Sequence, residues 1–127
     1  MERQLSIHSS EWKVMECIWE HEPVSIMQVV KFLQEESEWS KSTIITMINR
    51  LRKKGIIDYK EEKRSKVLYT LVSREEVALS ETDSLVEKVF HGSISLMLNT
   101  LLREQSITAE EKAELIDILD RAERKQL

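Results

Sequence analysis

The sequence has 127 residues and a formal net charge of −4, with 41% apolar and 33% charged residues. This composition is typical of a folded, well-solvated domain and excludes a disordered chain. Two Gly, one Pro and a single Cys argue against a β-sandwich, a glycine-rich nucleotide-binding loop, a disulfide framework and a thiolate metal site.

Two amphipathic helices are predicted in the first third of the chain. The first opens at Ser9-Ser10-Glu11, a hydroxyl cap followed by an acid at the positive end of the helix dipole, and ends before Pro23. Its buried stripe consists of Trp12, Met15, Ile18 and Trp19. The second helix begins at a capping box in which Gln28 follows Ser25 by three residues. Its apolar face consists of Ile26, Val29, Val30 and Leu33.

A third helix is predicted from Ser40 to Lys54, with Gly55 in the left-handed position that ends it. One face is apolar at offsets of 0, 3, 4 and 7 residues, namely Ile44, Met47, Ile48 and Leu51. The opposite face is polar and basic, with Ser42, Thr46, Asn49, Arg50 and Lys53. This helix can therefore rest on a core and present hydrogen-bonding groups outward.

Two short strands, 56–61 and 66–71, follow this helix as a hairpin with a basic tip at Glu62–Ser65. The stretch from Lys41 to Lys66 holds nine Lys and Arg against three acids, although the whole chain is acidic. A local basic stretch indicates a polyanionic partner, whereas the plainer alternative is an ordinary solvated helix face.

Further helices are predicted in residues 73–127, which carry a net charge of −5. Capping boxes begin at Ser73 and Thr108, and Gly92 interrupts the pattern between them. About 55 residues in amphipathic helices bury too little surface to fold alone. We therefore expect their apolar stripes to pack on a second copy of the chain, as a two-fold dimer. The alternative is that they pack back on residues 1–72.

The order of elements predicts a mainly α fold with a small β-hairpin: a winged helix-turn-helix domain over 1–72 and a C-terminal helical dimerisation domain over 73–127. Such a helix fits the major groove of double-stranded DNA, and cations at the hairpin tip suit phosphates. The expected DNA-binding residues are Lys41, Ser42, Thr43, Thr46, Asn49, Arg50, Lys53, Lys63 and Arg64.

Several stretches together resemble one known family. They are Ile7–Met15, similar to an opening I-S-x-x-E-W-x-V-M, then Ile18-Trp19, Trp39–Ile44, Arg50-Leu51 and Lys53–Gly55, with Leu96–Asn99 in the second half. The chain is similar here to the penicillinase and methicillin-resistance repressors (BlaI/MecI), which share a family with the copper-responsive repressor CopY.

This resemblance implies a homodimeric repressor that occupies a dyad-symmetric DNA operator. In the penicillinase branch a membrane-bound sensor-protease pathway leads to cleavage after an Asn. The matching bond here is Asn99–Thr100, where Thr100 replaces the branch's usual Phe. The cysteine cluster of the copper-responsive branch has no counterpart, so we expect no metal site of that kind.

The sequence contains no recognisable catalytic motif. The three histidines, His8, His21 and His91, do not have the spacing of metal ligands. Neither Cys17 nor any Ser lies in a nucleophile motif. We therefore expect no enzyme activity and no cofactor. No apolar run approaches a membrane span, and Met1–Ser10 has no signal core, so we expect a cytoplasmic protein. A winged-helix protein-interaction module and an effector-sensing regulator remain the alternatives.

Overall fold

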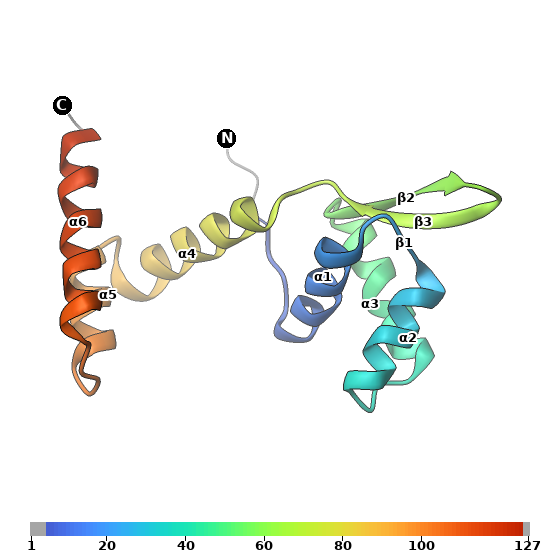
Figure 1. Ribbon diagram of the computed structural model, residues 1–127, viewed down its shortest axis with the longest axis horizontal. Coiled ribbons are helices and arrows are strands. Elements are labelled where there is room, and N and C mark those ends of the chain that lie inside the picture. Colours follow the sequence, from blue (N-terminus) through green and yellow to red (C-terminus); the bar gives the residue numbers. More distant parts are fainter. Residues whose placement is uncertain (1–4, 126–127) are drawn as a thin grey trace. The chain divides into compact units, whose positions relative to one another are not determined.

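The computed structural model describes residues 5–125, which form six helices and three short strands (Figure 1). The chain divides into two compact units, Met1–Ser84 and Leu85–Leu127. Within the described residues, no helix has both the length and the apolar character needed to cross a membrane.

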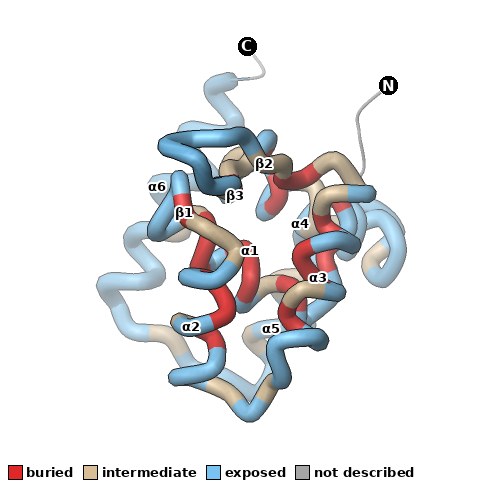
Figure 2. The backbone as a smooth tube through the Cα atoms, turned by 90° about the vertical axis from the view of Figure 1, so that its right-hand side faces the viewer, coloured by how far each residue is buried: buried red, intermediate tan, exposed pale blue. Residues whose placement is uncertain are grey.

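Three helices of the first unit enclose its core: α1 (Ser9–His21), α2 (Ile26–Glu36) and α3 (Lys41–Lys53). Buried positions concentrate where these helices face one another (Figure 2). The predicted stripes supply this core, since Met15, Ile18 and Leu33 are almost completely buried. Trp12 and Trp19 are half-buried against it, with ring centroids 5.8 Å apart. Helix α2 starts at the predicted capping box, where the Gln28 N–H donates to Ser25 Oγ at 3.1 Å.

The start of α1 differs from the prediction. His8 occupies the N-cap position, so the expected hydroxyl cap at Ser9-Ser10 is wrong. Glu11 lies in the first turn as predicted, but it does more than interact with the helix dipole. The Glu11 carboxylate accepts a hydrogen bond from the His8 N–H at 2.9 Å and is itself fully buried.

A three-stranded antiparallel sheet adjoins the helices, in the order β1-β3-β2. Its hairpin is formed by β2 (Ile57–Glu62) and β3 (Ser65–Thr70), each one residue away from the predicted bounds. The third strand, β1 (Val24–Ser25), was not predicted and pairs Val24 with Leu68. This arrangement of three helices and a small sheet is the predicted winged-helix fold.

Helix α4 (Arg74–Phe90) begins in the first unit and continues into the second. The first unit reaches Ser84, twelve residues past the boundary expected between 72 and 73. The reason is that the start of α4 packs on the core of the first unit: Val77 is fully buried, and Ser80 accepts a hydrogen bond from the Leu5 N–H at 3.0 Å.

The second unit contains the end of α4, then α5 (Ile94–Leu102) and α6 (Ala109–Lys125). Gly92 separates α4 from α5 with φ of +83°, as the sequence predicts for a helix break. Neither α5 nor α6 contains a buried residue in the single chain. Exposed apolar side chains along this unit include Leu85, Val89, Ile94, Leu101, Ile116, Ile118 and Leu119.

Candidate nucleic-acid interface

Helix α3 separates its apolar and polar residues onto opposite faces. Ile44, Ile48 and Leu51 are fully buried in the core, and Met47 is nearly so. The predicted DNA-binding residues of this helix are all exposed: Lys41, Ser42, Thr43, Thr46, Asn49, Arg50 and Lys53. The back of α3 is therefore fixed by packing while its front remains accessible along its whole length.

Hydroxyl groups order the first two turns of α3. Ser40 caps the helix by accepting a hydrogen bond from the Thr43 N–H at 3.2 Å, and its own hydroxyl donates to Thr43 Oγ1 at 3.0 Å. Ser40 and Ser42 hydroxyls lie 3.1 Å apart. The Thr46 hydroxyl donates to the Ser42 carbonyl at 2.8 Å, which leaves its oxygen able to accept a further hydrogen bond. The helix thus presents oriented acceptors near its N-terminus.

A shallow groove runs along this exposed face. The predicted residues Ser42, Thr43, Thr46 and Arg50 line it, together with Ser10 and Trp39 and the edge of Met47. Lys13 on α1 lies over the Trp39 ring, with its Nζ 5.7 Å from the centroid. Ser10 and Trp39 were not predicted at this surface. Trp39 lies just before the helix cap and outside the helical stripes, and that position is the signal that could have identified it.

The hairpin tip consists of Lys63 and Arg64, both exposed. Their φ angles are +50° and +71°, so this two-residue loop places both residues in the left-handed region. Glycine and asparagine adopt such angles at the least cost, and a β-carbon makes them unfavourable. Lys63 and Arg64 therefore occupy positions where the turn itself favours glycine or asparagine.

Two tyrosines of the hairpin hold cations close to their rings. Lys66 Nζ lies 4.5 Å from the Tyr59 ring centroid, and Lys60 Nζ lies 5.6 Å from that of Tyr69. From α3, the Arg52 guanidinium carbon lies 4.0 Å from the same Tyr59 ring and its Nε 3.5 Å from an Asp58 oxygen. Arg52 thereby links the end of α3 to the first strand of the hairpin.

An ion pair between the partly exposed Lys54 and the fully buried Glu11 fixes the C-terminal end of α3. Lys54 Nζ lies 2.8 Å from Glu11 Oε1 on α1 and donates a second hydrogen bond to the Ser6 carbonyl at 3.1 Å. Burial opposes ionisation of Glu11, but the hydrogen bonds from Lys54 and the His8 N–H, with the Lys54 charge, lower its pKa below the ordinary value for glutamate. Glu11 therefore stays ionised near neutral pH, and its contact with Lys54 ties α3 to α1.

The nine predicted residues thus lie in two places, on the exposed face of α3 and at the hairpin tip. Sequence reasoning placed Lys54 among the bases of the basic stretch but not with Glu11, since 43 residues separate the two partners. The predicted cleavage residues, Asn99 and Thr100, are exposed on α5 in the second unit.

A family model described as penicillinase repressor matches residues 7–121 of the chain. The chain belongs to the penicillinase repressor family. Among its relatives, the methicillin resistance regulatory protein MecI of Staphylococcus aureus (strain N315) is 30% identical over 115 residues, covering 91% of this chain and 94% of MecI. The penicillinase repressor of Bacillus licheniformis is 30% identical over 120 residues, covering 94% of each chain.

Two solved structures of BlaI resemble part of this chain. One is the monomeric form of BlaI from Bacillus licheniformis in complex with the blaP half-operator, 34% identical with a TM-score of 0.54. The other is the DNA-binding domain of the repressor BlaI, 34% identical with a TM-score of 0.53. Each match covers 60% of this chain and 93% of the solved chain. The resemblance to the family, first seen in short stretches of sequence, is thereby confirmed.

Proposed function

We propose that this chain is a DNA-binding transcriptional repressor that occupies a dyad-symmetric operator as a homodimer. The observation that carries the proposal is the division of α3 into a fully buried apolar back and an exposed polar front. A helix of this kind can enter the major groove without disturbing the core behind it. The similarity of part of this chain to a relative solved with a half-operator supports the same conclusion.

Within this proposal, α3 reads bases and the hairpin tip contacts phosphates. Asn49 and Arg50 carry side chains that pair with two atoms of a base edge, Asn with adenine and Arg with guanine. Lys63 and Arg64 carry charge at the end of a narrow hairpin, which suits contact with the DNA backbone. Ser42, Thr43 and Thr46 supply shorter donors and acceptors to the same face, while Lys41 and Lys53 supply charge at its ends.

Selection of bound fragments from genomic DNA by the full chain tests this assignment. On the selected duplex, Asn49→Ala and Arg50→Ala should each weaken binding by about 1 to 3 kcal/mol, with a much smaller loss on random-sequence DNA. Gln34→Ala, an exposed change on α2, is the matched control and should leave both affinities unchanged. Equal losses on the selected and random duplexes would show that Asn49 and Arg50 do not read bases.

The dimer is proposed from the second unit. Its exposed apolar side chains include Ile94, Leu101 and Leu119, which are 59%, 53% and 53% exposed in the single chain. Large apolar side chains exposed in this number on one small unit favour an interaction site, and a second copy would cover them with the same residues in return. Two linked DNA-binding units then engage two half-sites at high effective concentration.

Sedimentation of the full chain and of residues 1–84 tests the dimer. The truncation ends at the boundary of the first unit, which has its own core, so it should fold and sediment as a monomer. It should also bind the selected duplex far more weakly, because it engages a single half-site. A truncated chain that sediments as a tight dimer would place the dimer contact outside the second unit.

The proposal extends to inactivation by cleavage at Asn99–Thr100. The bond lies within α5, where the Thr100 hydroxyl donates to the Leu96 carbonyl at 2.8 Å, so a protease requires local opening of the helix. Cleavage would remove the end of α5 and all of α6, including Leu101, Ile116 and Leu119. Burial of one such side chain contributes about 1.5 to 3 kcal/mol, so their loss would weaken the dimer strongly.

Expression of residues 1–99 tests whether this cut can act as the switch. The shortened chain should be monomeric and should lose most of its affinity for the selected duplex. Its affinity for a duplex carrying one half-site should match that of the full chain, since the first unit is intact. Residues 1–99 that dimerise and bind the full operator as tightly as the complete chain would rule out this bond as the switch.

A further inference from the structure

The shallow groove on the exposed face of α3, here called the α3 groove, has an apolar part as well as a polar part. Its polar lining includes Ser42 and Arg50. Its apolar lining comes from Trp39, which is half-buried against the core, and from the edge of the nearly buried Met47. A surface that read DNA through hydrogen bonds alone would not need these apolar atoms beside its donors and acceptors.

Trp39 is held in place from two neighbouring helices. The Trp39 N–H donates to Ser37 Oγ at 3.3 Å, and the Ser37 hydroxyl donates to the Leu33 carbonyl of α2 at 2.7 Å. From α1, Lys13 Nζ lies 5.7 Å from the centroid of the Trp39 ring. All of these contacts lie within the first unit. The ring is therefore positioned before DNA binds, which lowers the entropy lost on binding.

The methyl group of Thr46, another residue of the α3 groove, is also fixed. Threonine in a helix divides between two χ1 rotamers, and a hydrogen bond from its hydroxyl to the preceding turn holds one of them. The Thr46 hydroxyl makes such a bond, to the Ser42 carbonyl at 2.8 Å. Because hydroxyl and methyl share the same χ1 angle, this bond sets the position of the methyl group as well.

The apolar part of the α3 groove restricts which group of a base pair can lie against it. In the major groove, base edges display hydrogen-bond donors and acceptors and one apolar group, the C5-methyl of thymine. A donor or acceptor placed against Trp39 and Met47 would lose its water without gaining a partner. The thymine methyl group loses nothing there, and the adjacent O4 of the same base can still accept a hydrogen bond from the polar lining.

We propose that Trp39, Thr46 and Met47 form a binding site for the C5-methyl group of an operator thymine, which makes Trp39 a specificity-determining residue. This inference rests on the proposed DNA-binding function and deepens it, because it adds an apolar contact to the hydrogen bonds assigned to Asn49 and Arg50. The site lies within a single copy of the first unit, so each half-site should contain such a thymine.

The test replaces the thymines of the duplex selected by the full chain with deoxyuridine, one position at a time. Deoxyuridine lacks the C5-methyl group and keeps the hydrogen-bonding groups of thymine. For the wild-type full chain, at least one replacement in a half-site should weaken binding by about fourfold, the ratio expected when one methyl group loses its apolar contact. The thymine at that position is the sensitive thymine.

Three variants of the full chain then assign the methyl contact. Trp39→Ala should bind the thymine and deoxyuridine forms of the sensitive position within about 1.5-fold of each other, because the contact no longer exists in either complex. Trp39→Phe keeps an apolar ring without the indole N–H and should retain a ratio of about twofold or more. Thr46→Ser keeps the hydroxyl at an exposed position, so folding is retained, and should lower the ratio to about twofold.

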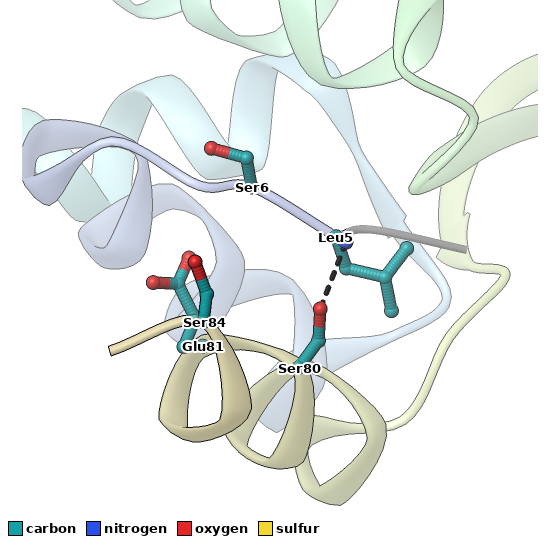
Figure 3. A pocket seen from close by; sticks show the side chains of 5 residues that line it. All are labelled: Leu5, Ser6, Ser80, Glu81 and Ser84. Carbon is teal, nitrogen blue, oxygen red and sulfur yellow. Dashed lines mark hydrogen bonds between the residues drawn. The ribbon is translucent and has the colours of Figure 1, made fainter. Parts of the chain in front are cut away.

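A control variant comes from a different pocket of the first unit. Figure 3 shows this smaller pocket, which Ser84 lines together with Leu5 and Ser80. Ser84 is exposed on α4 and lies outside the α3 groove. Ser84→Ala removes one hydroxyl, as small a change as Thr46→Ser, and should keep the fourfold ratio of the wild type.

Failure of this inference and failure of the proposed function give different results. A wild type that prefers the selected duplex over random DNA, yet changes by less than about 1.5-fold at every thymine, overturns the methyl site and leaves the DNA-binding proposal intact. A sensitive thymine that keeps its fourfold effect in both Trp39→Ala and Thr46→Ser also overturns it, because another surface then contacts the methyl group. A wild type that binds all duplexes equally overturns both proposals.

Discussion

Replacing Lys54 by Met should destabilise the first unit by up to about 3 to 5 kcal/mol, because it leaves the buried Glu11 carboxylate without its charged partner. The Glu11 carboxylate is fully buried, and the substitution takes away its donor at 2.8 Å. Since small domains are stable by about 5 to 15 kcal/mol, the loss is a large share of the total. Urea unfolding of the full chain at neutral pH, followed by tryptophan fluorescence, measures the difference.

Three comparisons isolate the ion pair as the cause. Lys53→Met removes the neighbouring exposed charge and should change stability by no more than about 0.5 kcal/mol. Glu11→Leu combined with Lys54→Met leaves no charge in the core and should recover much of the loss. Equal stabilities of the Lys53→Met and Lys54→Met proteins would refute the reasoning, because the buried carboxylate would then be stable without its partner.

The same pair predicts a direction for the pH dependence. The pKa of Glu11 is lower in the folded chain than in the unfolded chain, because hydrogen bonds from Lys54 and His8 outweigh burial. Its contribution to stability is therefore complete above the unfolded pKa of glutamate, about 4.3, and is lost as the pH falls through the folded value. In Glu11→Leu/Lys54→Met this part of the acid dependence should be absent.

The remaining predictions concern the hairpin tip, the cysteine and the helix break. Lys63→Ala/Arg64→Ala should weaken all duplexes about equally and reduce the salt slope of binding by about 2, whereas Lys112→Ala on α6 should change neither. Burial, with a smaller effect of Glu36 and Glu20, raises the pKa of Cys17 to about 11, so at pH 8 only about one thiol in a thousand is ionised. Iodoacetamide should therefore label Cys17 much faster in urea than in the folded protein, and equal labelling rates would contradict its burial. Gly92→Ala should lower the free energy of unfolding by about 1 to 2 kcal/mol, since φ is +83° and the added β-carbon meets Glu87 Oε1 at 3.3 Å. Gly92→Asn should lower it less, and thermal unfolding of both variants measures the difference.

The features predicted correctly from sequence are those set by neighbouring residues. Helix α2 begins where Ser25 and Gln28 form a capping box, and the apolar face of α3 follows from the spacing of its own residues. The features that sequence reasoning missed depend on contacts between distant residues. Strand β1 exists because Val24 pairs with Leu68, and Glu11 is buried because Lys54 reaches it across 43 residues.

The candidate DNA-binding surface also contains residues that sequence patterns did not identify. The exposed residues of α3 could be identified because helix periodicity separates them from the core. Ser10 joins them only through the packing of α1 beside α3, and no local pattern encodes that contact. Trp39 directly precedes the Ser40 cap of α3, so its position was available from the sequence. The attachment of α4 to the first unit was not predicted either, because it depends on backbone hydrogen bonds from Leu5 and Ile7.

The left-handed backbone at Lys63 and Arg64 has a consequence for how this hairpin can evolve. Asn-Gly is the pair that such a turn favours, so substitutions toward it should increase folding stability while removing both cations. Selection for a more stable fold and selection for a cationic tip therefore act in opposite directions on the same two codons. Variants recovered under thermal selection alone should lose charge here first, before any residue of α3 changes.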